Sequence, residues 1–246
     1  MKNKSSRKKK DGLYYVAIIT LIMIVVFSAV QIYRIAAGYI ADRDAYSDVR
    51  DIADPADTDD IDWNALRKTN PDVIAWIRLE DSNIDYPIVQ GSDNDYYLHT
   101  RFDGTAAGSG TLFADYRSES PFGQFNTVVY GHHMKDGSMF GNLKKFKDIE
   151  YAERHRSFSI FTPNGSYELE LVAFLNCPYD SLIYDVNVSG QDRSKYIKWI
   201  EKNAEYTTDV IVDENDRLVV LSTCAYEYEG ARYVVVGKIT DKEELR

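Results

Sequence analysis

The sequence contains little cysteine. Only Cys177 and Cys224 occur among its 246 residues, and there is no C-x-x-C pair and no H-E-x-x-H motif. The chain is therefore not a disulfide-rich scaffold, and it lacks the common signatures of a zinc site. One disulfide is possible outside the cell, although a body of about 200 residues needs no such crosslink. Cys177 ends the apolar run 171–177, which favours a packed thiol.

Positive charge is scarce beyond the first twelve residues. The chain has 29 Lys and Arg against 39 Asp and Glu, a formal net charge of -10. Residues 1–12 contain six of these cations and one carboxylate, a sum of +5, so the remainder has a net charge of -15. An acidic body offers no basic face to phosphates, which argues against a nucleic-acid partner.

Charged residues are absent from Leu13 to Tyr33, a run of 21 residues rich in Ile, Val, Leu, Ala and Met. At 1.5 Å per residue this run spans a hydrocarbon core of about 30 Å. The basic residues precede it, so the positive-inside rule predicts a single-pass membrane anchor with residues 1–12 in the cytoplasm and the body outside. A cleaved signal peptide is the alternative, but its apolar run is usually about 7–15 residues long. We expect an uncleaved anchor at 13–33 and an acidic extracellular stalk at 34–60, helical at first and irregular at Pro55.

Short strands dominate from residue 61 onward, after a short helix that begins near Asp62 and ends before Pro71. Pro163-Asn-Gly165 predicts a tight hairpin turn, and Pro87 predicts that its strand lies at a sheet edge. Helical spacing is confined to about 138–146 and 192–203. Eight runs have strand-like composition: 73–77, 84–89, 111–114, 127–130, 158–161, 167–174, 218–223 and 233–236. The predicted fold class is mainly β, an eight-stranded barrel with short helices in its connections.

Reactive side chains adjoin three of these strands. Cys224 ends one strand, His132 follows another, and Arg232 opens the last. A strand fixes the backbone while the loop beyond it leaves the side chain accessible. A nearby cation favours the nucleophilic thiolate, a histidine can exchange protons, and an arginine can hold an oxyanion. Cysteine, histidine and arginine thus form a complete set for acyl transfer.

Other interpretations of these residues are open. A lone cysteine in an apolar strand is most often a core residue. Zinc binding is the rival chemistry, but the adjacent His132 and His133 point to opposite faces of an extended chain, so at most one would face Cys224. For His133, His99 and His155 we expect surface or packing roles.

Several blocks resemble the sortases, the membrane-anchored transpeptidases of Gram-positive bacteria. Val220-Leu-Ser-Thr-Cys224 resembles their T-L-x-T-C signature, Val129-Tyr-Gly-His132 their histidine strand, and Arg232-Tyr-Val-Val-Val-Gly237 their arginine strand. The eight-residue step from Cys224 to Arg232 is similar to class B members. Further class B-like blocks, in the same order, are Asn70-Pro-Asp-Val-Ile-Ala-Trp76, Asn83-Ile-Asp-Tyr-Pro-Ile-Val-Gln-Gly91, Asn94-Asp-Tyr-Tyr-Leu98 and Met134-Lys-Asp-Gly-Ser-Met-Phe-Gly141.

The resemblance implies a sortase catalytic domain over residues 61–246 that acts on secreted proteins with a C-terminal sorting signal. By this resemblance Cys224 attacks the carbonyl of the signal's threonine to form a thioacyl intermediate, His132 protonates the leaving amine, and Arg232 stabilises the oxyanion. An amine of the peptidoglycan stem or cross-bridge then resolves the thioester, without a metal or organic cofactor. The implied substrate-binding residues are Asn94, Leu98, Ser222 and Tyr184.

Two other functions fit the same residues. A cell-surface cysteine peptidase would deliver the acyl group to water instead of an amine. A non-catalytic anchored binding module would use Cys224 only for packing. Product analysis with an amine acceptor distinguishes the first alternative, and a thiol-directed probe distinguishes the second.

Overall fold

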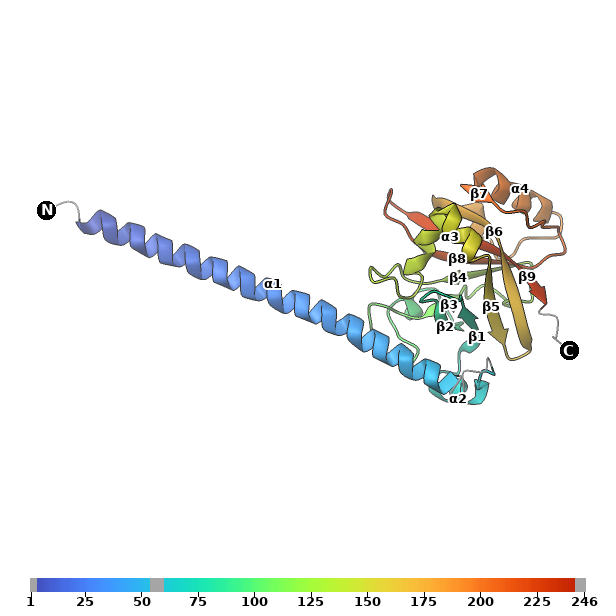
Figure 1. The fold of residues 1–246 in the computed structure, drawn as a ribbon, viewed down its shortest axis with the longest axis horizontal. Coiled ribbons are helices and arrows are strands. Elements are labelled where there is room, and N and C mark those ends of the chain that lie inside the picture. The colour runs from blue at the N-terminus through green and yellow to red at the C-terminus, as the bar shows by residue number, and fades with distance from the viewer. Residues whose placement is uncertain (1–3, 54–59, 242–246) are drawn as a thin grey trace. The chain divides into compact units, whose positions relative to one another are not determined.

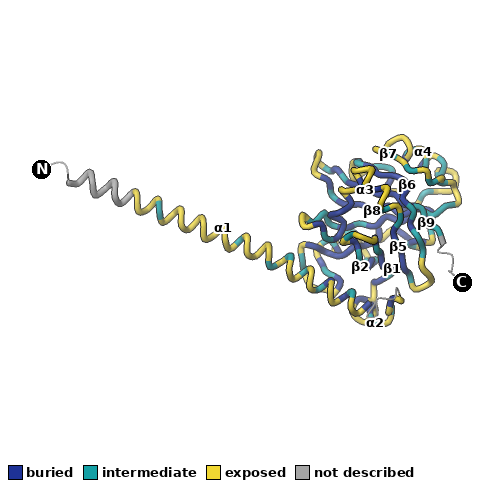
Figure 2. Tube along the Cα trace, in the orientation of Figure 1, coloured by how far each residue is buried: buried dark blue, intermediate teal, exposed yellow. Residues whose placement is uncertain are grey.

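The computed structural model describes residues 4–53 and 60–241, and the chain divides into two compact units, Met1–Asp44 and Ala45–Arg246. One long helix, α1 (Lys4–Ala53), makes up the described part of the first unit and enters the second. No proline interrupts its hydrogen bonding. Most of its large apolar side chains from Tyr14 to Tyr33 are exposed (Figure 2), and by length and composition this helix can cross a membrane.

The last turns of α1 contribute to the core of the second unit. Tyr46, Val49 and Ala53 are buried, and their spacing of three and four places them on one face of the helix. The Tyr46 hydroxyl donates a hydrogen bond to the carbonyl oxygen of Gly110 and lies 3.2 Å from Oγ1 of Thr111. The end of the helix is therefore held by both apolar packing and hydrogen bonds.

The second unit is a closed β-barrel (Figure 1). The strand order is β5-β1-β2-β3-β4-β8-β9-β6-β7, and β5 also pairs with β6, so eight strands form a closed barrel. The short β7 pairs with β6 beyond the part of β6 that pairs with β5. The strands are β1 (Val73–Arg78), β2 (Asp85–Val89), β3 (Leu112–Ala114), β4 (Asn126–Tyr130), β5 (Ser157–Thr162), β6 (Gly165–Pro178), β7 (Tyr206–Thr207), β8 (Leu218–Cys224) and β9 (Ala231–Asp241). The predicted eight-stranded barrel is confirmed.

Short helices fill the connections, as predicted. They are α2 (Trp63–Thr69), η1 (Tyr96–Leu98), η2 (Gly141–Lys147), α3 (Ile149–Arg154), η3 (Leu182–Tyr184) and α4 (Arg193–Asn203). In α4, which packs on β6, Tyr196 and Ile200 are buried on one face, as the helical spacing predicted. The helix expected at 138–146 begins only at Gly141, because Gly137 and Met139 have positive φ angles of 84° and 51°, outside the helical region.

The sheet is buried on both faces where β4, β8, β9 and β6 lie side by side. Val219 and Leu221 point into the barrel interior, whereas Leu218 and Val220 pack outward in a second apolar cluster with Ile200 of α4. Side chains alternate along a strand, so a strand covered on both faces is apolar at successive positions. This double burial explains why 218–221 reads as one unbroken apolar run.

Two local predictions have different outcomes. The hairpin is confirmed, because Thr162 pairs with Gly165 across the two-residue turn and Gly165 has a positive φ of 152°. The edge-strand prediction for Pro87 is wrong, because β2 lies between β1 and β3. Pro87 pairs with Trp76 of β1, whereas the pairing of β2 with β3 starts one residue later, at Ile88. The missing N–H of Pro87 therefore costs no hydrogen bond to β3.

Candidate active site

Strand direction brings Cys224 and His132 to one edge of the barrel. The strands β4 and β8 are parallel, with Tyr130 opposite Ser222, so both chains leave the sheet at the same end. Cys224 lies two residues beyond Ser222, and His132 two residues beyond Tyr130. A parallel pair therefore places a thiol and an imidazole close together although 92 positions separate them in the sequence.

Arg232 lies directly across the sheet from the cysteine. The strands β8 and β9 are antiparallel, and Cys224 is the register partner of Arg232. Register partners project from the same face of a sheet, so the guanidinium and the thiol share the outer face. Nη1 of Arg232 donates to the carbonyl oxygen of Ala231 at 2.9 Å, and the guanidinium carbon lies 6.0 Å from the ring centroid of Tyr179.

A cavity of about 360 Å³ opens where these strands end. Its wall includes all three predicted catalytic residues, Cys224, His132 and Arg232. It also includes all four predicted substrate-binding residues, Asn94, Leu98, Ser222 and Tyr184. The remaining lining residues are Phe113, Tyr130, Gly131, Tyr179 and Thr223. The structure thus brings together seven residues that the sequence scatters over 139 positions, from 94 to 232.

The His132 ring has a defined orientation. Its Nε2 lies 2.7 Å from the carbonyl oxygen of Leu98, which can only accept, so Nε2 bears a proton. In the neutral ring Nδ1 is then the basic nitrogen. Gly131 is required just before it, since a Cβ there would lie 2.3 Å from Cδ2 of Leu112 and 2.7 Å from Cδ2 of Phe140. The backbone can approach these side chains only at glycine.

Cys224 and Cys177 are in different environments. Both are free thiols, with Cys177 buried and Cys224 partly exposed. Each is a register partner of Arg232, so strand β9 separates them by two strand spacings, about 9.5 Å. A disulfide needs Cα atoms within roughly 7 Å, so these two cysteines cannot pair here. Cys177 is 4% exposed, which confirms that it is a packed thiol, and this burial raises its pKa.

A carboxylate behind the cavity connects several of its residues, and the sequence analysis missed it. The side chain of Asp115 is fully buried and accepts hydrogen bonds from Arg117 (2.7 Å), Tyr130 (3.0 Å) and Asn94 (3.1 Å). Burial alone would raise the pKa of Asp115, but the bonds from Arg117 and Tyr130 outweigh it and lower this pKa. The available signal was its position, directly after β3, where a charged residue follows a buried strand.

Asp115 also supports the loop that closes one side of the cavity. Arg117 donates to the carbonyl oxygen of Tyr184 at 3.2 Å, and the Tyr184 hydroxyl lies 2.9 Å from Oγ of Ser222. The Tyr130 and Tyr184 rings stack with centroids 6.1 Å apart. Burial raises the pKa of Tyr184, so this hydroxyl stays protonated as a hydrogen-bonding group.

The remaining histidines differ in how well the sequence predicted them. His99 is exposed, and His155 stacks on Tyr151 with ring centroids 3.9 Å apart, so surface and packing roles are confirmed for these two. His133 is different, because its Nδ1 lies 2.6 Å from the carbonyl oxygen of Cys224. Its ring also lies against Tyr233, outside the cavity that His132 lines. The sequence predicted that His132 and His133 point to opposite faces of the chain, but it did not predict the contact between His133 and the backbone of Cys224.

Comparison with known proteins agrees with the motifs. Residues 77–240 match the sortase domain family. Sortase B of Listeria monocytogenes is 38% identical over 180 residues, which cover 72% of this chain and 73% of that protein. Sortase B of Staphylococcus aureus is 32% identical over 180 residues, which cover 72% and 74%.

Solved structures show the same relationship. A crystal structure of sortase B from B. anthracis in complex with AAEK1 has a TM-score of 0.76 at 33% identity, covering 84% of this chain and 99% of that one. The predicted class B resemblance is therefore confirmed by both sequence and fold. The chain belongs to the sortase family of cysteine transpeptidases.

Proposed function

We propose that this enzyme cleaves the C-terminal sorting signal of a secreted substrate protein after the threonine of the signal. It then joins the new C-terminus of the substrate protein to an amine of the cell-wall peptidoglycan. One observation carries the proposal: a thiol, an imidazole and a guanidinium, on Cys224, His132 and Arg232, line one cavity at the edge of the barrel. These are the nucleophile, the proton carrier and the oxyanion donor that acyl transfer needs.

In the first half of the reaction the Cys224 thiolate attacks the carbonyl carbon of the signal's threonine. The developing oxyanion accepts hydrogen bonds from the guanidinium of Arg232, whose planar fork suits an oxygen anion. The C–N bond then breaks, and the protonated ring of His132 gives a proton to the departing amine nitrogen. The products are a thioester on Cys224 and the free C-terminal fragment of the signal.

In the second half an amine of a peptidoglycan stem or cross-bridge attacks the thioester carbonyl. His132 takes a proton from the attacking nitrogen, the C–S bond breaks, and the Cys224 thiolate is restored. The sorting peptide is proposed to lie along Asn94, Leu98, Tyr184 and Ser222, which together form the wall beside the thiol. The apolar ring of Tyr130 and the side chain of Leu98 suit a peptide with uncharged residues.

The proposed location is the cell membrane, with the barrel outside and the N-terminus in the cytoplasm. The support is the apolar exposed part of α1 and the cations that precede it at residues 2–10. A catalytic barrel outside the cell can reach both proposed substrates, the secreted protein and the peptidoglycan amine.

The test is a ligation assay with the full chain in detergent. A fluorescent peptide carrying a sorting pentapeptide and an excess of a peptidoglycan-type amine are supplied, and products are separated by mass. We expect a ligated product whose formation is abolished by Cys224→Ala and reduced about 10²- to 10⁴-fold by His132→Ala. Hydrolysis alone at saturating amine would instead identify a peptidase, and undiminished turnover by Cys224→Ala would refute the assignment of the nucleophile. Repeating the assay over a panel of pentapeptides identifies the signal.

A further inference from the structure

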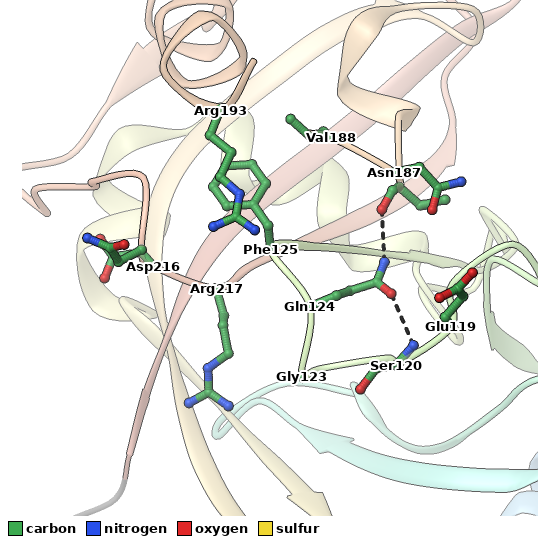
Figure 3. A pocket seen from close by; sticks show the side chains of 12 residues that line it. Glu119, Ser120, Gly123, Gln124, Phe125, Asn187, Val188, Arg193, Asp216 and Arg217 are labelled. Carbon is green, nitrogen blue, oxygen red and sulfur yellow. Dashed lines mark hydrogen bonds between the residues drawn. The ribbon is translucent and has the colours of Figure 1, made fainter. Parts of the chain in front are cut away.

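A second cavity, of about 390 Å³, lies at the other end of β4 and β8 (Figure 3). It opens where these parallel strands begin, at Gln124 and Phe125 before β4 and at Asp216 and Arg217 before β8. Arg217 and Cys224 are seven positions apart along an extended strand, which corresponds to about 23 Å. No residue that lines the active-site cavity lines this one.

Arg193 at the start of α4 points into this cavity with most of its hydrogen-bonding capacity unused (Figure 3). Its guanidinium lies over the ring of Phe125, 4.9 Å from the centroid, and Nη1 donates to the carbonyl oxygen of Glu214 at 2.9 Å. Its Nε is buried and has no hydrogen-bond partner. Within residues 60–241 Arg193 forms no ion pair and Nη2 forms no hydrogen bond. The Nε–Nη2 edge is the side of a guanidinium that binds a carboxylate through two parallel bonds.

The two charged side chains that flank Arg193 in the cavity wall, Asp216 and Arg217, have other partners. Asp216 pairs with Lys238 at 2.9 Å and accepts a hydrogen bond from the backbone of Asp213. Arg217 lies 5.0 Å from the Tyr167 ring centroid and bonds the carbonyl of Phe122. In Figure 3 its side chain is directed away from Arg193.

Glu119 lies across the cavity, on the side of Ser120, and forms no ion pair with Arg193 among the described residues. The Nε–H of this edge is buried without an acceptor, which is costly unless a ligand supplies one. Arg193 is therefore the group in this cavity that an anionic ligand would bind.

The remaining wall matches a peptide better than a bare inorganic ion. Phe125, Val186 and Val188 form an apolar side, and the exposed amides of Asn187 and Asn215 can pair with peptide groups. We propose that this cavity is a second binding site, in which Arg193 takes the carboxylate of a peptide through its Nε–Nη2 edge.

The second cavity shares one loop with the active site. Gln124 donates to the carbonyl oxygen of Val186 at 3.0 Å, and Asn126 donates to those of Ile183 and Asp185 at 3.2 and 2.8 Å. The intervening Tyr184 lines the active-site cavity. One short segment, 183–188, therefore contacts both cavities.

The experiment titrates the full chain in detergent micelles with N-acetylalanine and observes the Nε–H signal of Arg193 by NMR. We expect saturable shifts of this signal and of the backbone amides of 186–188. The uncharged N-acetylalaninamide should cause neither. Inorganic phosphate should bind more weakly than N-acetylalanine; equal or tighter phosphate binding would overturn the assignment to a peptide carboxylate.

Variants distinguish a direct contact between Arg193 and the carboxylate from a loss of folding and from a change in overall charge. Arg193→Gln should weaken binding at least about tenfold, while Arg193→Lys, which keeps the charge and loses the fork, should recover only part of it. Glu119→Gln should tighten binding, and Arg217→Gln should change it by no more than about threefold. Cys224→Ala should leave binding unchanged, so this result is independent of the transpeptidase assay. Unaltered affinity in Arg193→Gln, or shifts confined to the Cys224 cavity, would refute the site.

Discussion

The carbonyl oxygen of Cys224 accepts a hydrogen bond from Nδ1 of His133, at 2.6 Å. The His133 ring also lies 5.3 Å from that of Tyr226 and 5.9 Å from that of Tyr233, measured between centroids. The second histidine therefore holds the backbone of the nucleophile from outside the cavity, and its ring packs against Tyr226 and Tyr233.

His133→Ala should lower kcat about five- to tenfold with little change in KM for the sorting peptide. The expected size is that of one neutral hydrogen bond that holds the nucleophile in place. His133→Asn should restore most of the rate, because its amide nitrogen can occupy the place of Nδ1, whereas His133→Gln places its amide farther out. Steady-state kinetics of the three variants provide the measurement.

A matched control for this series is His155→Ala, at a histidine that stacks on Tyr151 away from the cavity. It should leave kcat unchanged. Equal rates for His133→Asn and His133→Ala would show that the hydrogen bond to Cys224 does not position the thiol.

A thiol-alkylating reagent should label Cys224 and spare Cys177 in the folded protein. Cys177 is 4% exposed, and burial raises its thiol pKa, so its reaction is expected to be on the order of 100-fold slower. Mass spectrometry of digested, labelled protein measures both sites. In denaturant both cysteines should react alike, and a disulfide-linked peptide pair in the unreduced protein would contradict the separation by β9.

Arg232→Lys should lower kcat about 10²-fold although it keeps the positive charge. An ammonium cannot reproduce the two-pronged contact of a guanidinium with an oxyanion. KM for the sorting peptide should change by less than about threefold, because the loss is confined to the transition state. Arg154→Lys, an exposed arginine on α3, is the control. A rise in KM with kcat intact would instead make Arg232 a substrate-binding residue.

Asp115→Asn should destabilise the protein by about 2–3 kcal/mol at neutral pH, since it removes the charged acceptor of Arg117, Tyr130 and Asn94. The folded-state pKa of Asp115 is lowered below 3.8. Its stabilisation is thus complete above the unfolded-state pKa and is lost as pH falls through the folded-state value.

The difference in unfolding free energy between wild type and Asp115→Asn should therefore shrink as pH falls below about 4. Chemical denaturation across this pH range measures it. Asp180→Asn, at an exposed position, should show no such dependence. A difference that stays constant down to pH 2 would mean that the Asp115 charge contributes nothing to stability.

The strands, the hairpin turn at Pro163-Asn-Gly165 and α4 follow from the sequence because their signals are local. Strand composition, a turn that accepts positive φ, and apolar spacing of three and four each act within a few residues. The strand-end positions of Cys224 and His132 could be read in the same way, and the order of the motif blocks then indicated the family. The apolar run at 13–33 is also local, and it predicts the anchor without reference to any neighbour.

Tertiary structure alone decided which groups meet. The position of Pro87 inside the sheet, the hydrogen bonds from Tyr130 and Asn94 to Asp115, and the hydrogen bond from His133 to Cys224 all depend on partners 15 to 91 residues away. The unpartnered Nε of Arg193 depends on which described residues lie around it. Such contacts arise from strand register and direction, which short stretches of sequence do not encode. The sequence by itself determined the chemistry available to this protein, and the closure of the barrel determined where that chemistry is assembled.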